Sequence, residues 1–355
     1  MYRYQPVYKP FALLLTVIVC SLFSISTRAV AKSPLRDETV ILGIISSNPQ
    51  KAFKRAQPFA DYLAKSLSKH GIKTGQVVVS RDSRQMARWM KNGQVDLVSE
   101  TVFAAQELMQ YSGAELLARR WKSGVAMYHS IFFSKINSGV NTLDDLRGKT
   151  VVFEDKGSTS AFLVPAGILL EQGYDLYELS SPRDTPPENK IGYFFSDEYS
   201  KSGGETNMIN WVHRNLVASA AFSNLDWEKE IPEQVKQQLQ VFHTSQVIPR
   251  SLVLARPNLP FELKQNILAV LLSAHENEEG QQALKVYKKT KKFDAITPEI
   301  VQSIYCASVL AEKKKEYVEA ARVMGFKAPR IMFRHILPNC LSPIFAGTEF
   351  LSPEI

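Results

Sequence analysis

The sequence has few cysteines, and their scarcity limits its chemistry. The three cysteines stand at positions 20, 306 and 340, so residues 32–305 contain none. That body therefore holds no disulfide framework, no zinc site built on thiolates and no cysteine nucleophile. The six histidines do not fall at metal-ligand spacing, and no Ser–His pair is evident. We expect a protein that is not an enzyme and that needs neither a metal nor a cofactor.

Long hydrophobic runs are also scarce. The longest, FALLLTVIVCSLFSIS at residues 11–26, is too short to indicate a membrane span. Arg3 and Lys9 precede it and Ala-Val-Ala follows it, which is typical of a secretory signal peptide cleaved after Ala31. Cys20 would suggest a lipoprotein anchor, but the residue before it is not small. We expect a periplasmic or otherwise exported protein.

An excess of charge of one sign is absent as well. The chain carries a formal net charge of +8, but residues 32–308 carry only +3 of it, which is ordinary for a soluble protein. The run from Lys288 to Lys292 is typical of a solvated helix end. We expect no nucleic-acid partner.

Alternating strand and helix patterns fill the body of the chain. Apolar runs such as TVILGII from Thr39 predict buried strands, and one-sided apolar faces such as that of residues 49–69 predict helices. Repeated β-α-β units predict an α/β fold with a mostly parallel sheet and helices on both of its faces. We expect two lobes joined by chain crossings near 122–128 and 244–252, with a central cleft. The expected divisions are a signal peptide at 1–31, lobe one at 32–124 and 248–300, lobe two at 125–247, and a tail at 301–355.

Small polar residues follow four of the expected strands. Each group suits helix capping, but ligands in α/β proteins also lie beyond strand ends, and four such groups indicate a polar cleft. The groups are Ser46-Ser47-Asn48, Ser99-Glu100-Thr101, Gly157-Ser158-Thr159-Ser160 and Ser223-Asn224.

The sequence GSTS at 157–160 is the most informative of these groups. A tight strand-to-helix turn needs a glycine and one capping hydroxyl, so the further hydroxyls are available to donate to an anion at a helix N-terminus. Pro165 comes too late for the first turn of a helix capped by Ser160. Either the helix is kinked there, or a separate turn precedes a helix that starts near Val164.

Other side chains extend the predicted site. Tyr128, at the first crossing, is the aromatic residue expected in the cleft. The carboxylates of Glu100, Glu205 and Asp226 stand near strand ends, where they would hold a ligand amine or else cap helices and pair with lysines.

The segment YHSIFFSKINSGVNTLDDLRGKTVVFEDKGSTSAFLVPAGILLEQGYD resembles the substrate-binding proteins of phosphate, phosphite and phosphonate ABC transporters. The resemblance covers about residues 39–298. It implies a two-lobed type II periplasmic binding fold in which Ser158, Thr159 and Ser160 bind the phosphorus oxyanion. Ala161 stands where relatives usually have glycine, and Gly204-Glu205-Thr206 replaces a Gly-Ser-His element of phosphonate-specific members, so phosphonate itself is not assumed.

The tail resembles a different protein. EYVEAARVMGFKAPRIMFRHILPN at 316–339 resembles the cytoplasmic EAA loop of dipeptide and oligopeptide ABC-transporter permeases. No flanking run is long enough to span a membrane, and export would place this loop away from an ATPase. A fusion or frameshift relic is the favoured interpretation, and a binding protein with its own coupling helix is the other.

These patterns predict a monomeric solute receptor that closes two lobes around a small oxyanion and delivers it to an ABC permease in the inner membrane. A ligand-sensing input module of a signalling system, or a non-functional fusion product, remains the alternative. The expected ligand-binding residues are Ser158, Thr159, Ser160, Tyr128, Ser46, Ser99, Thr101, Glu205 and Thr206.

Overall fold

The computed structural model describes residues 34–199 and 204–307 of the chain. It contains two units, Met1–Glu38 and Thr39–Ile355, and the described part of the first includes the short helix α2 (Pro34–Asp37). The expected signal peptide and the permease-like segment beyond residue 307 lie outside the described residues. Among the helices that are described, none has the length and apolar character needed to cross a membrane.

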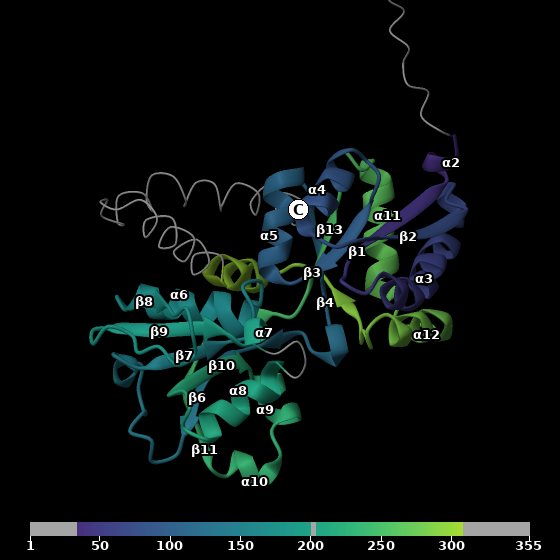
Figure 1. The fold of residues 1–355 in the computed structure, drawn as a ribbon. Coiled ribbons are helices and arrows are strands. Elements are labelled where there is room, and N and C mark those ends of the chain that lie inside the picture. Colours follow the sequence, from purple (N-terminus) through teal and green to yellow (C-terminus); the bar gives the residue numbers. More distant parts are fainter. Residues whose placement is uncertain (1–33, 200–203, 308–355) are drawn as a thin grey trace, which may run out of the picture. The chain divides into compact units, whose positions relative to one another are not determined.

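The first sheet of the second unit has six strands in the order β14-β4-β13-β3-β1-β2 (Figure 1). β1 runs parallel to β2 and β3, whereas β13 lies antiparallel between β3 and β4. The sheet is therefore mixed, and the expectation of mostly parallel strands is wrong for this half. The strands are β1 (Thr39–Ile45), β2 (Thr74–Ser80), β3 (Leu97–Glu100), β4 (Glu115–Arg120), β13 (Leu252–Ala255) and β14 (Phe293–Asp294).

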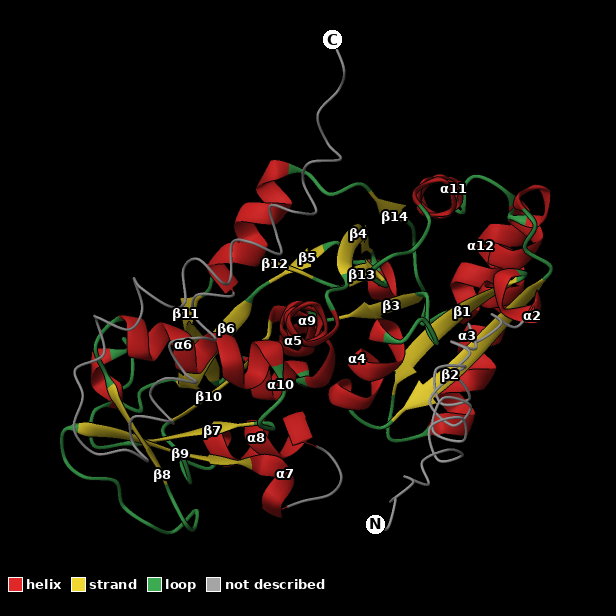
Figure 2. Ribbon diagram, turned by 90° about the horizontal axis from the view of Figure 1, so that it is seen from above, coloured by secondary structure: helices red, strands yellow, loops and turns green. Residues whose placement is uncertain are grey.

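Helices cover both faces of this sheet (Figure 2). Successive side chains of a strand point to opposite faces, so Val40 and Leu42 of β1 pack with α3, α11 and α12, while Ile41 packs with α4 and α5. The helical segments are α3 (Pro49–Ser66), η1 (Ser68–His70), α4 (Ser83–Lys91), α5 (Val102–Ser112), η2 (Lys122–Gly124), α11 (Phe261–Ser273) and α12 (Glu278–Val286).

The second sheet also has six strands, in the order β11-β6-β10-β7-β9-β8. The pairs β10–β7, β7–β9 and β9–β8 are parallel, and β6 is antiparallel to both β10 and β11. The strands are β6 (Ser130–Lys135), β7 (Thr150–Phe153), β8 (Asp175–Glu178), β9 (Lys190–Phe195), β10 (Ser219–Ser223) and β11 (Leu239–Thr244).

The same alternation gives the second sheet two covered faces. Val151 and Phe153 of β7 pack with residues of α6, and Val152 packs with residues of α8 and α9. The helical segments are η3 (Asp144–Leu146), η4 (Thr159–Leu163), α6 (Val164–Glu171), α7 (Ser196–Tyr199), α8 (Gly204–His213), α9 (Asn224–Glu230) and α10 (Glu233–Lys236).

Two short strands connect the sheets. β5 (Met127–Tyr128) pairs antiparallel with β12 (Ile248–Pro249), and the backbone N–H of Arg250 donates to the carbonyl of Ala126 at 2.8 Å. Both strands fall at or beside the crossings expected from the sequence. Between β5 and β6 the strand pairing is interrupted at His129, whose backbone N–H donates to the Asn224 side chain and whose carbonyl accepts from the Asn224 backbone N–H.

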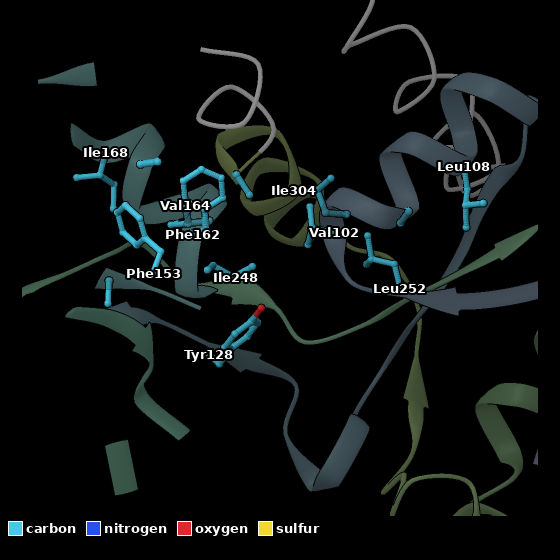
Figure 3. Packing of buried hydrophobic residues seen from close by; sticks show 14 of the residues in the cluster. Val102, Leu108, Tyr128, Phe153, Phe162, Val164, Ile168, Ile248, Leu252 and Ile304 are labelled. Atoms are coloured by element: carbon cyan, nitrogen blue, oxygen red, sulfur yellow. The ribbon is translucent and has the colours of Figure 1, made fainter. Parts of the chain in front are cut away.

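A helical segment at residues 298–307 completes the described chain. Its Ile300, Ile304 and Ala307 are buried in one hydrophobic cluster with Val102 of α5 and Val164 of α6 (Figure 3). The first residues of the expected tail are therefore part of the packed body.

Candidate functional site

The GSTS turn, Gly157–Ser160, leads from β7 to a single turn of π-helix, η4, which runs directly into α6. α6 begins at Val164 with Pro165 in its first turn, where a missing N–H costs nothing. The observed arrangement combines the two that the sequence left open: the α-helix starts at Val164, and the wide helical turn before it is continuous with that helix. π-turns are rare and frequently occur at functional sites.

Gly157 does not have the role expected of it. Its φ is not in the left-handed region, and a Cβ built on it would meet only the Asp155 carboxylate oxygen, at 3.3 Å. The turn therefore tolerates a side chain at this position, and the expectation that the turn needs a glycine is wrong.

The three hydroxyls of the turn have different surroundings. Ser158 caps the π-turn by accepting from the backbone N–H of Ala161 at 3.3 Å. The Thr159 hydroxyl is buried and has no partner within full hydrogen-bond geometry, and the Tyr128 phenol lies near enough for a weaker contact with it. The backbone carbonyl of Ser160 accepts from the hydroxyl of Ser130 on β6 at 2.6 Å, which fixes the turn against the sheet. An unpaired buried hydroxyl is costly, so Thr159 is the member of this turn that most needs a ligand.

Tyr128 reaches the same turn from β5. It is 2% exposed, and burial raises the pKa of its phenol, while the positive charge of Arg250 and the nearby hydroxyls of Ser160 and Thr159 oppose that rise. The guanidinium carbon of Arg250 lies 5.0 Å from the centre of the Tyr128 ring, and its Nε is buried without a partner. The strand β5 and the residue after β12 thus bring an aromatic ring and a cation to the turn.

Two carboxylates, Glu154 and Glu205, also lie near the turn. Burial, followed by repulsion from Glu205, raises the pKa of Glu154 to about 7, whereas the Ser158 hydroxyl lowers it by hydrogen bonding to the carboxylate. A Cβ built on Gly204, at the start of α8, would lie 3.7 Å from a Glu154 carboxylate oxygen. Glu205 therefore lies near the turn, and at neutral pH Glu154 is partly protonated and able to donate.

Asp226 has a capping role. Its backbone N–H donates to the Ser223 hydroxyl at 3.2 Å, and that hydroxyl donates to the Asp226 carboxylate, so Ser223 caps the start of α9 and the carboxylate holds the capping hydroxyl in place. Of the two roles considered for this carboxylate, the structural one is observed.

The first-lobe candidates are only partly free to bind. The hydroxyl of Ser46 is engaged in its own turn with the backbone of Asn48. Ser99 lies 3.0 Å from the hydroxyl of Ser251. Thr101 starts α5 without a capping bond from its side chain. The second-lobe candidate Thr206 is exposed on α8.

Three residues of this region were not expected from the sequence: Ser130, Glu154 and Arg250. Ser130 begins β6 and Glu154 follows β7, so both lie at strand ends, which is the kind of position that pointed to the other candidates. Arg250 follows Pro249 at the second crossing, where a lone arginine in a sequence resembles a surface residue.

One cavity of the protein lies away from this region. A cavity of about 400 Å³ lies between α6, residues 243–248 and residues 305–307, and none of the expected ligand-binding residues lines it. Within the described part of the chain, no group of three or more His, Cys, Asp or Glu side chains is arranged to hold a metal ion.

Comparison with known proteins places this architecture. Residues 42–300 match the family of periplasmic substrate-binding proteins of phosphonate ABC transporters. XAC2383 of Xanthomonas citri, in its ATP-bound structure, is 29% identical, with a TM-score of 0.70 over 79% of this chain and 99% of that one. PhnD1 of Prochlorococcus marinus, in complex with methylphosphonate, is 16% identical, with a TM-score of 0.52 over 81% and 99%. These similarities confirm the two-lobed type II periplasmic binding fold, and the relatives are binding proteins rather than enzymes.

The end of the chain matches a different family. Residues 303–354 match the inner-membrane component of binding-protein-dependent transport systems. A peptide transport system permease of Brucella suis is 47% identical over 45 residues, which are 13% of this chain and 15% of that permease. The expected resemblance of the tail to a permease is confirmed, over a small part of the permease's length.

Proposed function

The chain belongs to the family of periplasmic substrate-binding proteins of phosphonate ABC transporters, and on that premise we propose that it captures a small phosphorus oxyanion by closing its two lobes. The ligand is of the phosphate, phosphite or phosphonate class. The protein acts as an exported monomer and hands its ligand to an ABC permease of the inner membrane.

The observation that carries this proposal is the buried, unpaired hydroxyl of Thr159 in the GSTS turn. A tetrahedral oxyanion supplies the acceptor that this hydroxyl lacks, and Ser158 and Ser160 donate to its other oxygens. Glu154, when protonated, adds a further donor to the same anion. Tyr128 contributes its phenol from the connecting strand.

Residues of the first lobe complete the ligand's hydrogen bonds on closure. Thr101, whose hydroxyl does not cap its helix, is the favoured donor, and Ser46 and Ser99 are further candidates from the same lobe. In the second lobe, Glu205 acts on Glu154 beside the turn, and with Thr206 of the same helix it would favour ligands with a polar group on the far side of the anion. XAC2383 is bound to ATP in one structure and to chloride in another, and a site that accepts anions in this relative is in keeping with the proposal.

A thermal-shift series tests the ligand class. The protein is melted with phosphate, phosphite, methylphosphonate, aminoethylphosphonate, sulfate and small carboxylates. A ligand at 100 times its Kd stabilises the folded state by about 2.7 kcal/mol, which is a clear rise in Tm. The proposal expects that rise from a phosphorus oxyanion and little from the carboxylates. A cooperative melt that no phosphorus compound moves would overturn it.

Substitutions in the GSTS turn test the site. The double variant Ser158→Ala with Thr159→Ala is expected to abolish binding without unfolding the protein, at a cost of about 1 kcal/mol for the lost cap. Thr159→Val is the sharper change, because it keeps the shape and removes an unpaired hydroxyl, so stability should not fall while the Kd rises about tenfold or more.

Ser138→Ala is the matched control, since Ser138 also carries a buried hydroxyl without a partner, in the loop after β6. It should leave the Kd unchanged. Equal affinity in Thr159→Val and the unmodified protein would remove Thr159 from the site.

A further inference from the structure

A second group of charged side chains lies in the first lobe and at the connection between the sheets. Glu100 ends β3, Arg120 ends β4, Lys122 begins η2, Lys288 follows α12, and Arg250 follows β12. These five residues, the basic cluster, bring four cations around one carboxylate, and each influences the charge of its neighbours. One carboxylate does not balance four basic groups, and burial together with their mutual repulsion lowers the pKa values of Lys122 and Lys288.

Arg120 is the member of the cluster that is held in place by several hydrogen bonds. The Arg120 guanidinium is fully buried, donates to the hydroxyl of Thr290 and the carbonyl of Tyr287, both at 2.8 Å, and stacks 3.7 Å from the centre of the Tyr287 ring. The Nη1 of Arg120 donates to the hydroxyl of Ser99 at 3.4 Å. Arg120 therefore holds its place through neutral partners, and its charge adds to that of the lysines.

Lys122 and Lys288 lie in two neighbouring turns that contain residues with positive φ. Ser123, directly after Lys122, has φ 57°, and Lys288 and Lys289 have φ 51° and 50°, all in the left-handed region that side chains disfavour. The N–H of Ser123 donates to the carbonyl of Lys288 at 3.2 Å, so the two strained turns are tied directly to each other. Strain of this kind persists where the surrounding structure imposes it, and it is concentrated at ligand sites.

Glu100 alone does not compensate the basic side chains of the cluster. Burial lowers the pKa of Lys122 to about 7, and the charges of Lys288 and Arg250 lower it further than Glu100 raises it. Burial also lowers the pKa of Lys288. The Nε of Arg250 is buried and has no acceptor. An anionic group placed among these side chains would supply the acceptor and relieve their mutual repulsion.

The basic cluster adjoins the GSTS turn through one residue. Arg250 lies against the ring of Tyr128, whose phenol is next to Thr159 and Ser160, and its charge also acts on Lys122 and Lys288. Two anion-attracting groups, one of hydroxyls and one of cations, therefore meet at the connection between the sheets.

We propose that the basic cluster binds a second anionic group of the same ligand, so that the ligand is a compound with two or more linked phosphates, such as pyrophosphate or a nucleoside polyphosphate. This inference rests on the proposed function of the GSTS turn, and it narrows the ligand class. Lys122, Lys288 and Arg250 bind the second phosphate, and Glu100 orients the two lysines.

The test compares the Kd values of pyrophosphate, ATP, phosphate and methylphosphonate for the full chain, by calorimetry in the absence of divalent ions. Pyrophosphate is expected to bind about tenfold or more tightly than phosphate, which is the scale of one or two charge-assisted hydrogen bonds. The double variant Lys122→Gln with Lys288→Asn should lose that preference and keep its affinity for phosphate within about threefold. Asparagine is chosen at 288 because it tolerates the left-handed conformation.

Lys289→Asn is the matched control. Lys289 occupies the same turn with nearly the same φ, but its side chain is exposed and outside the basic cluster. It should change neither affinity. A melting curve without ligand shows whether each variant is folded, and Lys122→Gln alone serves if the double variant is not.

The outcomes separate this inference from the proposed function. If phosphate or methylphosphonate binds and pyrophosphate binds no more tightly, the inference is wrong and the proposed function stands. A pyrophosphate preference that survives in a folded double variant also overturns it. If none of the four compounds binds, the inference fails, and the proposed function fails with it when phosphite and aminoethylphosphonate also leave the Tm unchanged. Tight binding of ATP as well as pyrophosphate supports the inference and points to a nucleotide source for the ligand.

Discussion

The charge of Glu154 depends on its surroundings in the proposed site, first on its burial and then on its neighbours. It lies between the GSTS turn and the start of α8, where Glu205, Asp155 and Asp226 raise its pKa and a hydrogen bond from the Ser158 hydroxyl lowers it. A carboxyl that is neutral at pH 6 and charged at pH 8 makes anion binding depend on pH. The neutral form donates a hydrogen bond to the anion, and the charged form repels it.

The raised pKa of Glu154 predicts a stability that falls with pH. The carboxyl titrates near 4.5 in the unfolded chain and near 7 in the folded one. Between these values the folded state keeps a proton that the unfolded state has released, so the free energy of unfolding decreases as the pH rises through this window. Glu154→Gln should remove about 1–3 kcal/mol of that decrease, measured by denaturant unfolding from pH 4.5 to 8.

Glu188→Gln is the control, because Glu188 is exposed in the loop before β9. Its unfolding free energy should follow that of the unmodified protein at every pH. Parallel curves for Glu154→Gln and the unmodified protein would mean that Glu154 is charged throughout.

At the scale of elements, the close approach of β2 to α3 depends on one glycine. A Cβ on Gly75 would lie 2.0 Å from the backbone carbonyl oxygen of Ala60, and backbone yields less readily than a side chain. Gly75→Ala should cost about 2–3 kcal/mol of unfolding free energy, measured by denaturant titration.

Gly157→Ala provides the comparison within the same protein. Only the flexible carboxylate of Asp155 stands near the new methyl group, so the change should stay within about 0.5 kcal/mol. A larger loss at Gly157 than at Gly75 would contradict the close packing described for β2 and α3.

The elements that could be predicted are those with a strong local pattern. TVILGII, a run rich in β-branched residues, is β1 from its first residue to its last, and the one-sided apolar pattern after Asn48 is α3. β8 and β11 were missed because they lie at the edges of their sheet, and most of their side chains are not fully buried, so they leave no apolar run.

The site was predictable in part for the same reason. The hydroxyls of the GSTS turn and Tyr128 stand beside apolar runs, and the structure brings them together. The orphaned state of Thr159 was not predictable, because it depends on a π-turn that assigns the capping role to Ser158. The basic cluster joins residues up to 188 positions apart, and no local pattern records such a contact.

At the scale of the whole molecule, the helical segment at 298–307 links parts of the hydrophobic core that come from α5 and α6. Ile304, 2% exposed, is its most buried large side chain (Figure 3). Ile304→Ala should lower the unfolding free energy by about 2–4 kcal/mol, because it removes a buried side chain and leaves a cavity. Gln302→Ala, on the exposed side of the same segment, should change it little. Similar melting temperatures for both variants would place this segment outside the cooperative core.

The strand order of the first sheet also sets a sequence of events in time. β13 lies between β3 and β4, yet it is synthesised only after the whole second sheet, which is built from residues 130–244. A chain emerging from the ribosome can therefore finish its second lobe while the first still lacks a central strand. The lobe that is begun first is completed last, and until residue 255 has emerged the edges of β3 and β4 are left open to other partners.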